Sequence, residues 1–511
     1  MSAVATRYQI NYLFMKKLIA VIAIFFAAAL HAQDKNIPDK SIIDKNIVVT
    51  KHQVKVGAVT INYTATAGFM LMKDENDSLK AKVFFVAYTK DGEKDTSKRP
   101  ILFAYNGGPG SSSVWLHMGA IGPEKVVLSD KGEMLQPPFS YTDNEYTWLD
   151  KTDIVFIDPM MTGFTRPAHG EDKSNFTGFE NDTRFVGDFI RLYTTKYARW
   201  SSPKFIGGES YGTTRSAGVA NYLQERYGMY LNGVIMISAI LDFGADETDR
   251  GNDRPFPLQL PTFAATAWYH HKLSSQYADL DSLLKEVETF SLTDYASALL
   301  KGDALSETEK DQVADKLHQY TGLSKDYIRQ SNIRLYVGRF NKELLRDSGL
   351  TVGRLDSRFT GYDYDEAGEQ YEYDPSYDKT IYGPFAAVVN DYIKRELKFE
   401  SELPYEILTG RVGSWPLSND RYLNVAESLR EAMTKNPFLK VWIAQGYYDM
   451  ATPYFATENV VSHMFLKKDI RQNLHFTFYE AGHMVYINKP SLAQLKIDFS
   501  NFIQQALPKQ Q

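Results

Sequence analysis

The sequence contains no cysteine among its 511 residues. This absence excludes disulfide bonds, thiolate zinc sites, a cysteine nucleophile and a lipid-modified cysteine anchor. A chain of this length buries a core large enough to be stable without disulfides, so the absence is compatible with export to an oxidising compartment.

Sustained basic runs are also missing. The chain has 57 Lys and Arg against 63 Asp and Glu, which gives a formal net charge of −6 at pH 7. An acidic protein without a basic patch is poorly suited to bind nucleic acid, so we expect no nucleic-acid partner.

The N-terminal apolar run, Leu18–Leu30, is shorter than the ~20 residues that a membrane-spanning helix needs. It follows Lys16 and Lys17 and is succeeded by Ala32, a pattern typical of a secretory signal peptide. We therefore expect residues 1–32 to be a signal peptide and residues 33–47 a polar linker. The mature protein is then periplasmic or extracellular and free of the membrane. An uncleaved membrane anchor is the alternative.

Further along the chain, apolar strands alternate with helices. The predicted helices are Phe185–Tyr197 and one that ends at Tyr222. The predicted strands are Val54–Ala67, Lys82–Tyr88, Pro100–Tyr105, Ile154–Ile157, Lys204–Gly207 and Gly233–Ile240. This alternation predicts an α/β fold, a mostly parallel, doubly wound sheet with helices on both faces.

The alternation stops near residue 250 and returns after residue 418. Within the intervening stretch, residues 260–347 are charged and predicted to be mostly helical, with helices at Leu280–Phe290 and Glu307–Tyr320. Beyond it we expect helix Tyr422–Met433, strands Val441–Gln445 and His475–Tyr479, and helix Ser491–Gln505. The sequence thus predicts a catalytic core of residues 48–250 and 418–511 with an inserted, mainly helical cap of residues 251–417.

One tract inside the predicted cap is unusual. Residues 361–378 interleave seven acids with five tyrosines. We interpret this tract as a solvated acidic loop; a pocket lining and a cation site are the alternatives.

A serine lies at the junction of a predicted strand and helix. Gly208-Glu209-Ser210-Tyr211-Gly212 has the G-x-S-x-G pattern of a nucleophile elbow, in which small residues flank a sharp turn. The turn lifts the serine hydroxyl above the sheet edge, and the helix that follows offers a backbone N–H to a developing oxyanion. Ser210 is therefore the candidate nucleophile.

A serine hydroxyl needs a histidine to accept its proton and a carboxylate to orient that histidine. Asp449 and His483 follow strands Val441–Gln445 and His475–Tyr479, in the chain order that a G-x-S-x-G enzyme requires. Both lie at carboxyl ends of predicted strands, where open α/β sheets place their sites. We expect Ser210, Asp449 and His483 to form a catalytic triad.

A glycine-rich loop, Asn106–Ser113, follows the predicted strand Pro100–Tyr105. Its glycines allow the backbone to approach a ligand closely and direct an N–H group toward it. In G-x-S-x-G hydrolases the loop at this place supplies the second oxyanion donor. A tight glycine turn without function is the alternative, and a phosphate loop is disfavoured because no Gly-Lys-Ser/Thr follows.

Taken together, these segments resemble the serine carboxypeptidase family of α/β-hydrolases. The resemblance extends over residues 100–240 and 440–490 and hardly at all to the cap. The segments that carry it are Asn106–Ser113, Asn144–Trp148, Ile154–Phe164, Gly208–Gly212, the Asp449 loop and Gly482–Met484.

The resemblance implies roles for further residues. The backbone N–H groups of Gly108 and Tyr211 would form the oxyanion hole. Asn106, Gly107 and Glu209 would hold the terminal carboxylate of a peptide substrate, and no cofactor or metal is implied. The departures from the family pattern concern subsite specificity rather than reaction type: Ala104, Tyr105, Ser111, Asp158 followed directly by Pro159, and Gly212.

Glu209 carries a specific expectation. A carboxylate cannot attract another carboxylate, so Glu209 must be protonated to donate a hydrogen bond to the substrate. The substrate's charge and desolvation both favour the neutral acid, so we expect the pKa of Glu209 to rise when substrate binds. Free-acid peptides would then have a more acidic optimum than C-terminal amides or esters.

The sequence thus predicts a serine-type carboxypeptidase that acts through an acyl-enzyme. An acyltransferase or esterase on the same scaffold is the first alternative, because water and other acceptors compete for the same acyl-enzyme. A non-catalytic binding protein is the second, and the intact triad argues against it.

Overall fold

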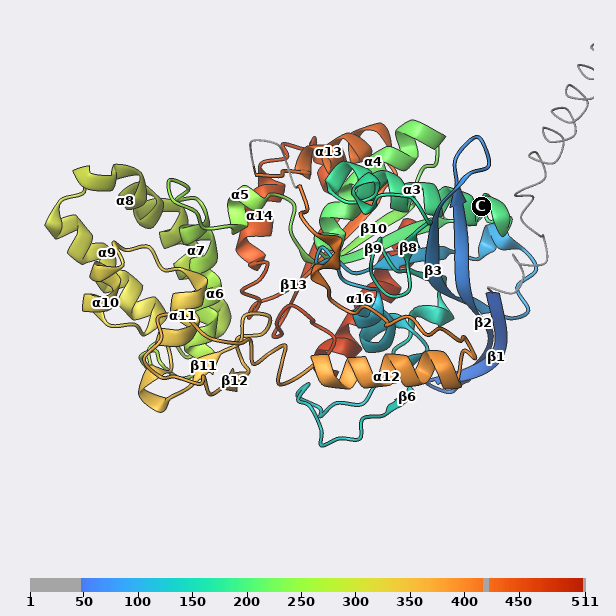
Figure 1. Cartoon of the computed structure of the whole chain (residues 1–511). Helices are drawn as coiled ribbons and strands as arrows, with labels where there is room; N and C mark the ends of the chain where they lie inside the picture. The colour runs from blue at the N-terminus through green and yellow to red at the C-terminus, as the bar shows by residue number, and fades with distance from the viewer. Residues whose placement is uncertain (1–46, 417–421, 509–511) are drawn as a thin grey trace, which may run out of the picture. The chain divides into compact units, whose positions relative to one another are not determined.

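A ten-stranded sheet lies at the centre of the part of the chain that the computed structural model describes, residues 47–416 and 422–508 (Figure 1). Short strand β8 (Arg166–Pro167) pairs with β3 at the side. The other strands pair in the order β1 (Ile47–Val56), β2 (Val59–Lys73), β3 (Leu79–Lys90), β7 (Asp153–Ile157), β4 (Ile101–Tyr105), β9 (Lys204–Ser210), β10 (Gly233–Ala239), β13 (Lys440–Gly446) and β14 (Leu474–Tyr479). The predicted signal peptide, residues 1–32, and all but the last residue of the predicted linker lie outside the described residues.

The successive pairs β7–β4, β4–β9, β9–β10, β10–β13 and β13–β14 are all parallel, whereas β3 pairs antiparallel with both β2 and β7. The predicted α/β fold with a mostly parallel sheet is therefore confirmed. Because β9, β13 and β14 run in the same direction, their carboxyl ends meet at one edge of the sheet.

The first predicted strand, Val54–Ala67, is wrong in its bounds. The chain reverses at Gly57, which has a φ of 58° and separates β1 from β2. A positive φ is available to glycine at little cost, so the apolar residues on both sides of Gly57 belong to two strands rather than one.

Helices cover both faces of the sheet, and alternate residues of each strand contact different helices. Phe103, Ile206 and Val234 belong to the cluster that includes helices α3 (Phe179–Lys196), α4 (Tyr211–Tyr227) and α13 (Ala426–Lys435). Their neighbours Leu102, Phe205 and Ile235 pack with helices α12 (Tyr382–Arg395) and α16 (Lys489–Ala506) on the other face. This period of two, with both faces apolar, is typical of a parallel sheet buried on both sides.

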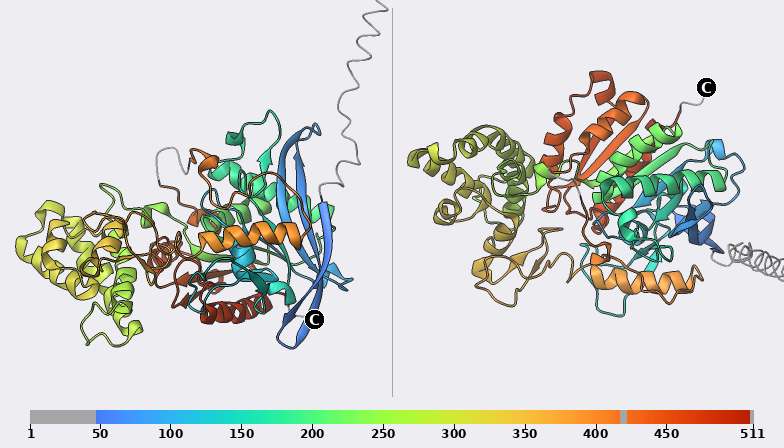
Figure 2. Two further views of the ribbon diagram at one scale, coloured as in Figure 1. Left: turned by 60° about the horizontal axis from the view of Figure 1, so that its bottom comes forward. Right: turned by 45° about the horizontal axis from the view of Figure 1, so that its top comes forward.

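A third apolar cluster lies outside the sheet. It is built by the helices of residues 255–343, which gather to one side of the sheet in Figures 1 and 2. They are α6 (Pro255–Tyr269), α7 (Leu280–Phe290), α8 (Ala296–Lys301), α9 (Glu307–Thr321), α10 (Lys325–Gln330) and α11 (Val337–Glu343). The helical character expected of residues 260–347 is thus observed, and α7 has the predicted bounds.

Helix α12 differs from the other helices of the predicted insertion 251–417. Its buried residues Phe385, Val388 and Tyr392 pack in the sheet cluster rather than in the cluster of α6–α11. The chain has therefore returned to the sheet about 35 residues before the predicted boundary at residue 418. Within residues 47–416 and 422–508, no helix combines the length and the apolar character required to cross a membrane.

Candidate active site

Ser210 is both the last residue of β9 and the N-cap of α4. Its φ of 59° and ψ of −134° are rare for a residue with a side chain, which makes the strand-to-helix turn very sharp. A Cβ on Gly208 would lie 2.1 Å from the Gly212 oxygen, and a Cβ on Gly212 would lie 3.0 Å from the Tyr105 oxygen. Both glycines are therefore required by close contacts of the elbow.

Asp449 and His483 are brought together by the ends of β13 and β14. Asp449 is fully buried, and its Oδ2 accepts a hydrogen bond from His483 Nδ1 at 2.8 Å. Oδ1 of the same carboxylate accepts the backbone N–H groups of Ala451 at 2.8 Å and Thr452 at 3.0 Å. These bonds fix the carboxylate, which in turn holds the Nδ1 proton of the imidazole and leaves Nε2 available as a proton acceptor.

Thr452 is a residue of this site that the sequence analysis missed. Its hydroxyl donates to Asp449 Oδ2 at 2.7 Å and lies 3.2 Å from His483 Nδ1. Its place three residues after the predicted acid is the sequence signal that points to it. Glu480, the other acid near His483 in sequence, is exposed, and its backbone oxygen accepts a hydrogen bond from Arg358.

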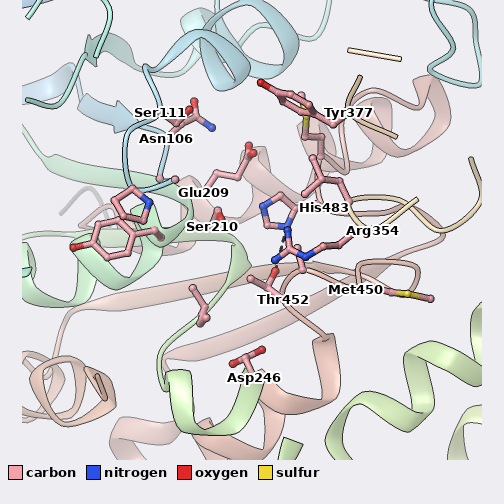
Figure 3. A pocket seen from close by; sticks show the side chains of 18 of the residues that line it. Asn106, Ser111, Glu209, Ser210, Asp246, Arg354, Tyr377, Met450, Thr452 and His483 are labelled. Atoms are coloured by element: carbon pink, nitrogen blue, oxygen red, sulfur yellow. Dashed lines mark hydrogen bonds between the residues drawn. The ribbon is translucent and has the colours of Figure 1, made fainter. Parts of the chain in front are cut away.

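The charge of Asp449 also sets the proton affinity of His483. Burial lowers the pKa of the imidazole, but the charge and hydrogen bond of Asp449 outweigh burial and raise the pKa above its usual value. The imidazolium that forms when a nucleophile gives up its proton is thereby stabilised. Ser210 and His483 line the same pocket (Figure 3).

The glycine-rich loop packs directly on the elbow. A Cβ on Gly107 would lie 2.4 Å from the Tyr211 nitrogen, so only glycine permits this approach. Gly108 has a φ of 99°, in the region that favours glycine. The loop is held at its far end by Asp158, whose Oδ1 accepts from the Ser113 backbone at 2.9 Å and its hydroxyl at 2.8 Å. The structure thus brings the predicted oxyanion donors, Gly108 and Tyr211, to adjoining segments.

Glu209 and Asn106 lie beside Ser210, and both are buried (Figure 3). Glu209 Oε2 accepts a hydrogen bond at 2.5 Å from the hydroxyl of Tyr486, a second residue that the sequence analysis missed. Burial raises the pKa of Glu209 to about 7, although His483, Tyr486 and Asn106 each act to lower it. The carboxyl group is therefore largely protonated in mildly acidic solution before any substrate is present.

The pocket around these residues has a volume of about 690 Å³. Its walls are formed by the elbow and the glycine-rich loop, by helices α6 and α11 of the third apolar cluster, and by the segment that precedes α12. The contributions from outside the predicted site include Asp246, Gln259, Val337, Arg354, Tyr377, Ile381 and Met450.

Tyr377 is the part of the acidic, tyrosine-rich tract that lines this pocket. Elsewhere in the tract, Asp363 forms a buried ion pair with Lys342. Among residues 47–416 and 422–508 there is no group of three or more side chains arranged to hold a metal ion. The tract therefore contributes to the pocket through a tyrosine, and its acids serve local hydrogen bonds such as those of Asp374 with Arg354 N and Ser376.

Comparison with known proteins gives a consistent result. A family model described as serine carboxypeptidase matches residues 57–475. The pheromone-processing carboxypeptidase KEX1 of Saccharomyces cerevisiae is 32% identical over 145 residues, which are 27% of this chain and 19% of that protein. Carboxypeptidase Y of the same yeast is 26% identical over 185 residues, 34% of this chain and 31% of that protein. The chain thus spans less than a third of the length of these curated relatives.

Among solved structures, that of KEX1(Δ)p, a prohormone-processing carboxypeptidase from Saccharomyces cerevisiae, is similar in fold. Its TM-score is 0.53 at 18% sequence identity, over 86% of this chain and 91% of that one. Together with the sheet order and the elbow, this similarity identifies the fold as that of the α/β-hydrolases.

Proposed function

The chain belongs to the serine carboxypeptidase family, and from this membership we propose that it removes C-terminal residues from peptides through an acyl-enzyme. Ser210 is the nucleophile, His483 the general base and acid, and Asp449 the carboxylate that orients the imidazole. The hydrogen bond of 2.8 Å between Asp449 and His483 and the positive φ of Ser210 support these roles.

The reaction proceeds in two halves. Ser210 Oγ forms a bond to the last peptide carbonyl carbon while His483 Nε2 accepts the hydroxyl proton. His483 then gives this proton to the leaving amine, the C–N bond breaks, and the C-terminal amino acid departs. Water attacks the ester by the same route, with His483 again as base, and releases the shortened peptide.

The oxygen of the tetrahedral intermediate carries a negative charge that needs donors. We assign these to the backbone N–H groups of Gly108 and Tyr211, the second of which is the first residue of α4. Such donors are each worth about 3 kcal/mol in the transition state. The close contact between Gly107 and the Tyr211 nitrogen supports this assignment.

The observation that carries the choice of a carboxypeptidase is the position and protonation of Glu209. It adjoins the nucleophile in the same pocket, and burial raises its pKa to about 7. A neutral carboxyl group there donates a hydrogen bond to the free carboxylate of a C-terminal residue, with Asn106 and Gly107 as the other contacts. An esterase or acyltransferase has no need of a protonated acid at this place.

For the location of the protein we propose export by the signal peptide of residues 1–32, so that the mature enzyme is periplasmic or extracellular. Lys16 and Lys17, the apolar run Leu18–Leu30 and Ala32 support this proposal.

The test is a set of peptides that are identical except for a free or an amidated C-terminus, with products identified by mass spectrometry. We expect release of single C-terminal residues from the free acids at pH 5–6 and much slower cleavage of the amides. The Ser210→Ala variant controls for contaminating peptidases. Equal rates on acids and amides at every pH, or cleavage of esters alone, would overturn the proposal.

A further inference from the structure

Tyr486 has no role in the proposed mechanism, yet it contacts a residue of the site directly. It follows His483 by three residues and precedes α16, and 1% of its surface is exposed. Its hydroxyl donates to Glu209 Oε2 at 2.5 Å. A tyrosine hydroxyl has a single proton to donate, so this bond determines how the hydroxyl is oriented.

The ring of Tyr486 packs against Gly119 on the facing segment, where the absence of a side chain leaves room for it. A Cβ on Gly119 would lie 2.7 Å from Tyr486 Cε2 and 3.1 Å from the ring of Phe385 on α12. Gly119 belongs to the helical turn Leu116–Ile121, which follows the glycine-rich loop. The absence of a side chain at residue 119 therefore provides the space in which the tyrosine ring lies.

Asn106 is fixed by the same helical turn that carries Gly119. Its Oδ1 accepts the Leu116 backbone N–H at 3.1 Å, so the amide NH₂ group is left for the other side. Burial raises the pKa of both Glu209 and Tyr486, and the nearby Asn106 amide acts against that rise in both groups.

We propose that Tyr486 is a positioning residue for substrate binding: by occupying Oε2 of Glu209 as a donor, it keeps the acid's proton on Oε1, ready for the substrate carboxylate. This inference rests on the proposed carboxypeptidase function. A carboxyl group rotates and protonates on either oxygen when neither is occupied, so the hydrogen bond from the tyrosine holds the carboxyl group in the orientation that presents its proton to the substrate. No covalent bond changes, and the substrate's carboxylate receives a hydrogen bond from Oε1.

The same contact affects the pH dependence. The ionisable groups that act on Glu209 are His483 and Tyr486, which lower its pKa, and Asp449, which raises it. Removal of the Tyr486 hydroxyl takes away a donor that favours the carboxylate, so the pKa of Glu209 rises further. The loss of affinity at alkaline pH then begins at a higher pH, while affinity at low pH falls because the proton is no longer held on Oε1.

The test is the Tyr486→Phe variant, assayed from pH 4.5 to 8.5 on free-acid peptides and on the matching amides or esters. We expect KM for free acids to rise about tenfold at pH 5, the worth of about one hydrogen bond. We also expect the alkaline increase in KM to move to higher pH, kcat to change less than threefold, and KM for amides to be unchanged. The matched control is Tyr295→Phe. It removes a buried hydroxyl that donates to Ile333 O at 2.6 Å within the apolar cluster of α6–α11.

Gly119→Ala is the second variant, because its Cβ displaces the Tyr486 ring without removing the hydroxyl. The same selective effect on free acids supports the proposal should the phenylalanine variant fold poorly. An equal effect on acids and amides, or an unmoved pH profile, would overturn it. If the unmodified protein does not distinguish free acids from amides, the proposed function itself fails, and the two failures are thereby separated.

Discussion

Replacement of Glu209 by Gln tests the protonation on which carboxylate binding depends, without the use of any substrate. The folded protein keeps Glu209 neutral up to about pH 7, whereas the unfolded chain ionises it near the usual value of 4.5. Between these pH values the folded state binds more protons than the unfolded state, so the stability of the unmodified protein falls as pH rises. Glutamine has no such titration and keeps an oxygen to accept the Tyr486 hydrogen bond.

The magnitude follows from the shift. A change of one unit in pKa corresponds to about 1.4 kcal/mol of free energy. Between pH 4 and pH 8, the free energy of unfolding of the variant therefore increases by about 3 kcal/mol relative to that of the unmodified protein. Unfolding entropies of about 2 cal/mol/K per residue give ~1 kcal/mol/K for a domain of ~460 residues, so this gain is about 3 °C in Tm.

The assay is scanning calorimetry of both proteins at half-unit steps from pH 4 to pH 8, with the difference in Tm plotted against pH. We expect a difference that is constant below pH 4.5, grows up to about pH 7 and is constant again above it.

Glu458→Gln is the matched control, because burial also raises the pKa of Glu458 to about 7 on α14 (Tyr454–Ser462), away from the pocket. The control should show a pH-dependent difference in Tm and unchanged catalysis. A flat curve for Glu209→Gln would mean that Glu209 is ionised in the folded protein, and carboxylate binding through it would be refuted.

Three further substitutions have defined outcomes. Ser210→Ala should abolish turnover and leave Tm within about 2 °C, because a partly exposed hydroxyl packs little; substantial peptidase activity in a pure preparation would assign the nucleophile elsewhere. Asp449→Asn should lower kcat about 10⁴-fold, because an asparagine in a Ser-His-Asp triad stabilises the wrong imidazole tautomer, and a loss below about tenfold in steady-state kinetics would show that another group orients His483. Gly107→Ala should abolish activity and lower Tm, because its Cβ meets the Tyr211 nitrogen at 2.4 Å, and phosphonylation of Ser210 by a fluorophosphonate at the normal rate would contradict that geometry.

The parts of the site that can be predicted from sequence are those fixed by local order along the chain. The elbow at Ser210 needs its flanking glycines within two residues, and Asp449 and His483 follow their strands within a short loop. Such constraints are visible in a single sequence. Tyr486 was missed because its role arises from a contact with Glu209, 277 residues away in sequence.

The errors in the fold have similar causes. The sequence predicts one strand over Val54–Ala67 because both sides of Gly57 have strand-like residues, and a single glycine does not reveal that the chain reverses there. Helix α12 falls within the predicted insertion because its amphipathic pattern shows that one face is buried but not against which layer. Only the packing of Phe385 and Tyr392 in the sheet cluster resolves this.

The pairing of β10 with β13 has a consequence for the timing of activity during synthesis. Gly233 pairs with Lys440, and Asp449 and His483 follow only after that point. A ribosome must therefore translate more than 200 further residues after Ser210 before the sheet can close and the proton relay can assemble. Long-range pairing of this kind is also slow to form. A chain that is still under synthesis accordingly lacks the complete triad, which can assemble only after the segment through His483 has been made and has folded onto the sheet.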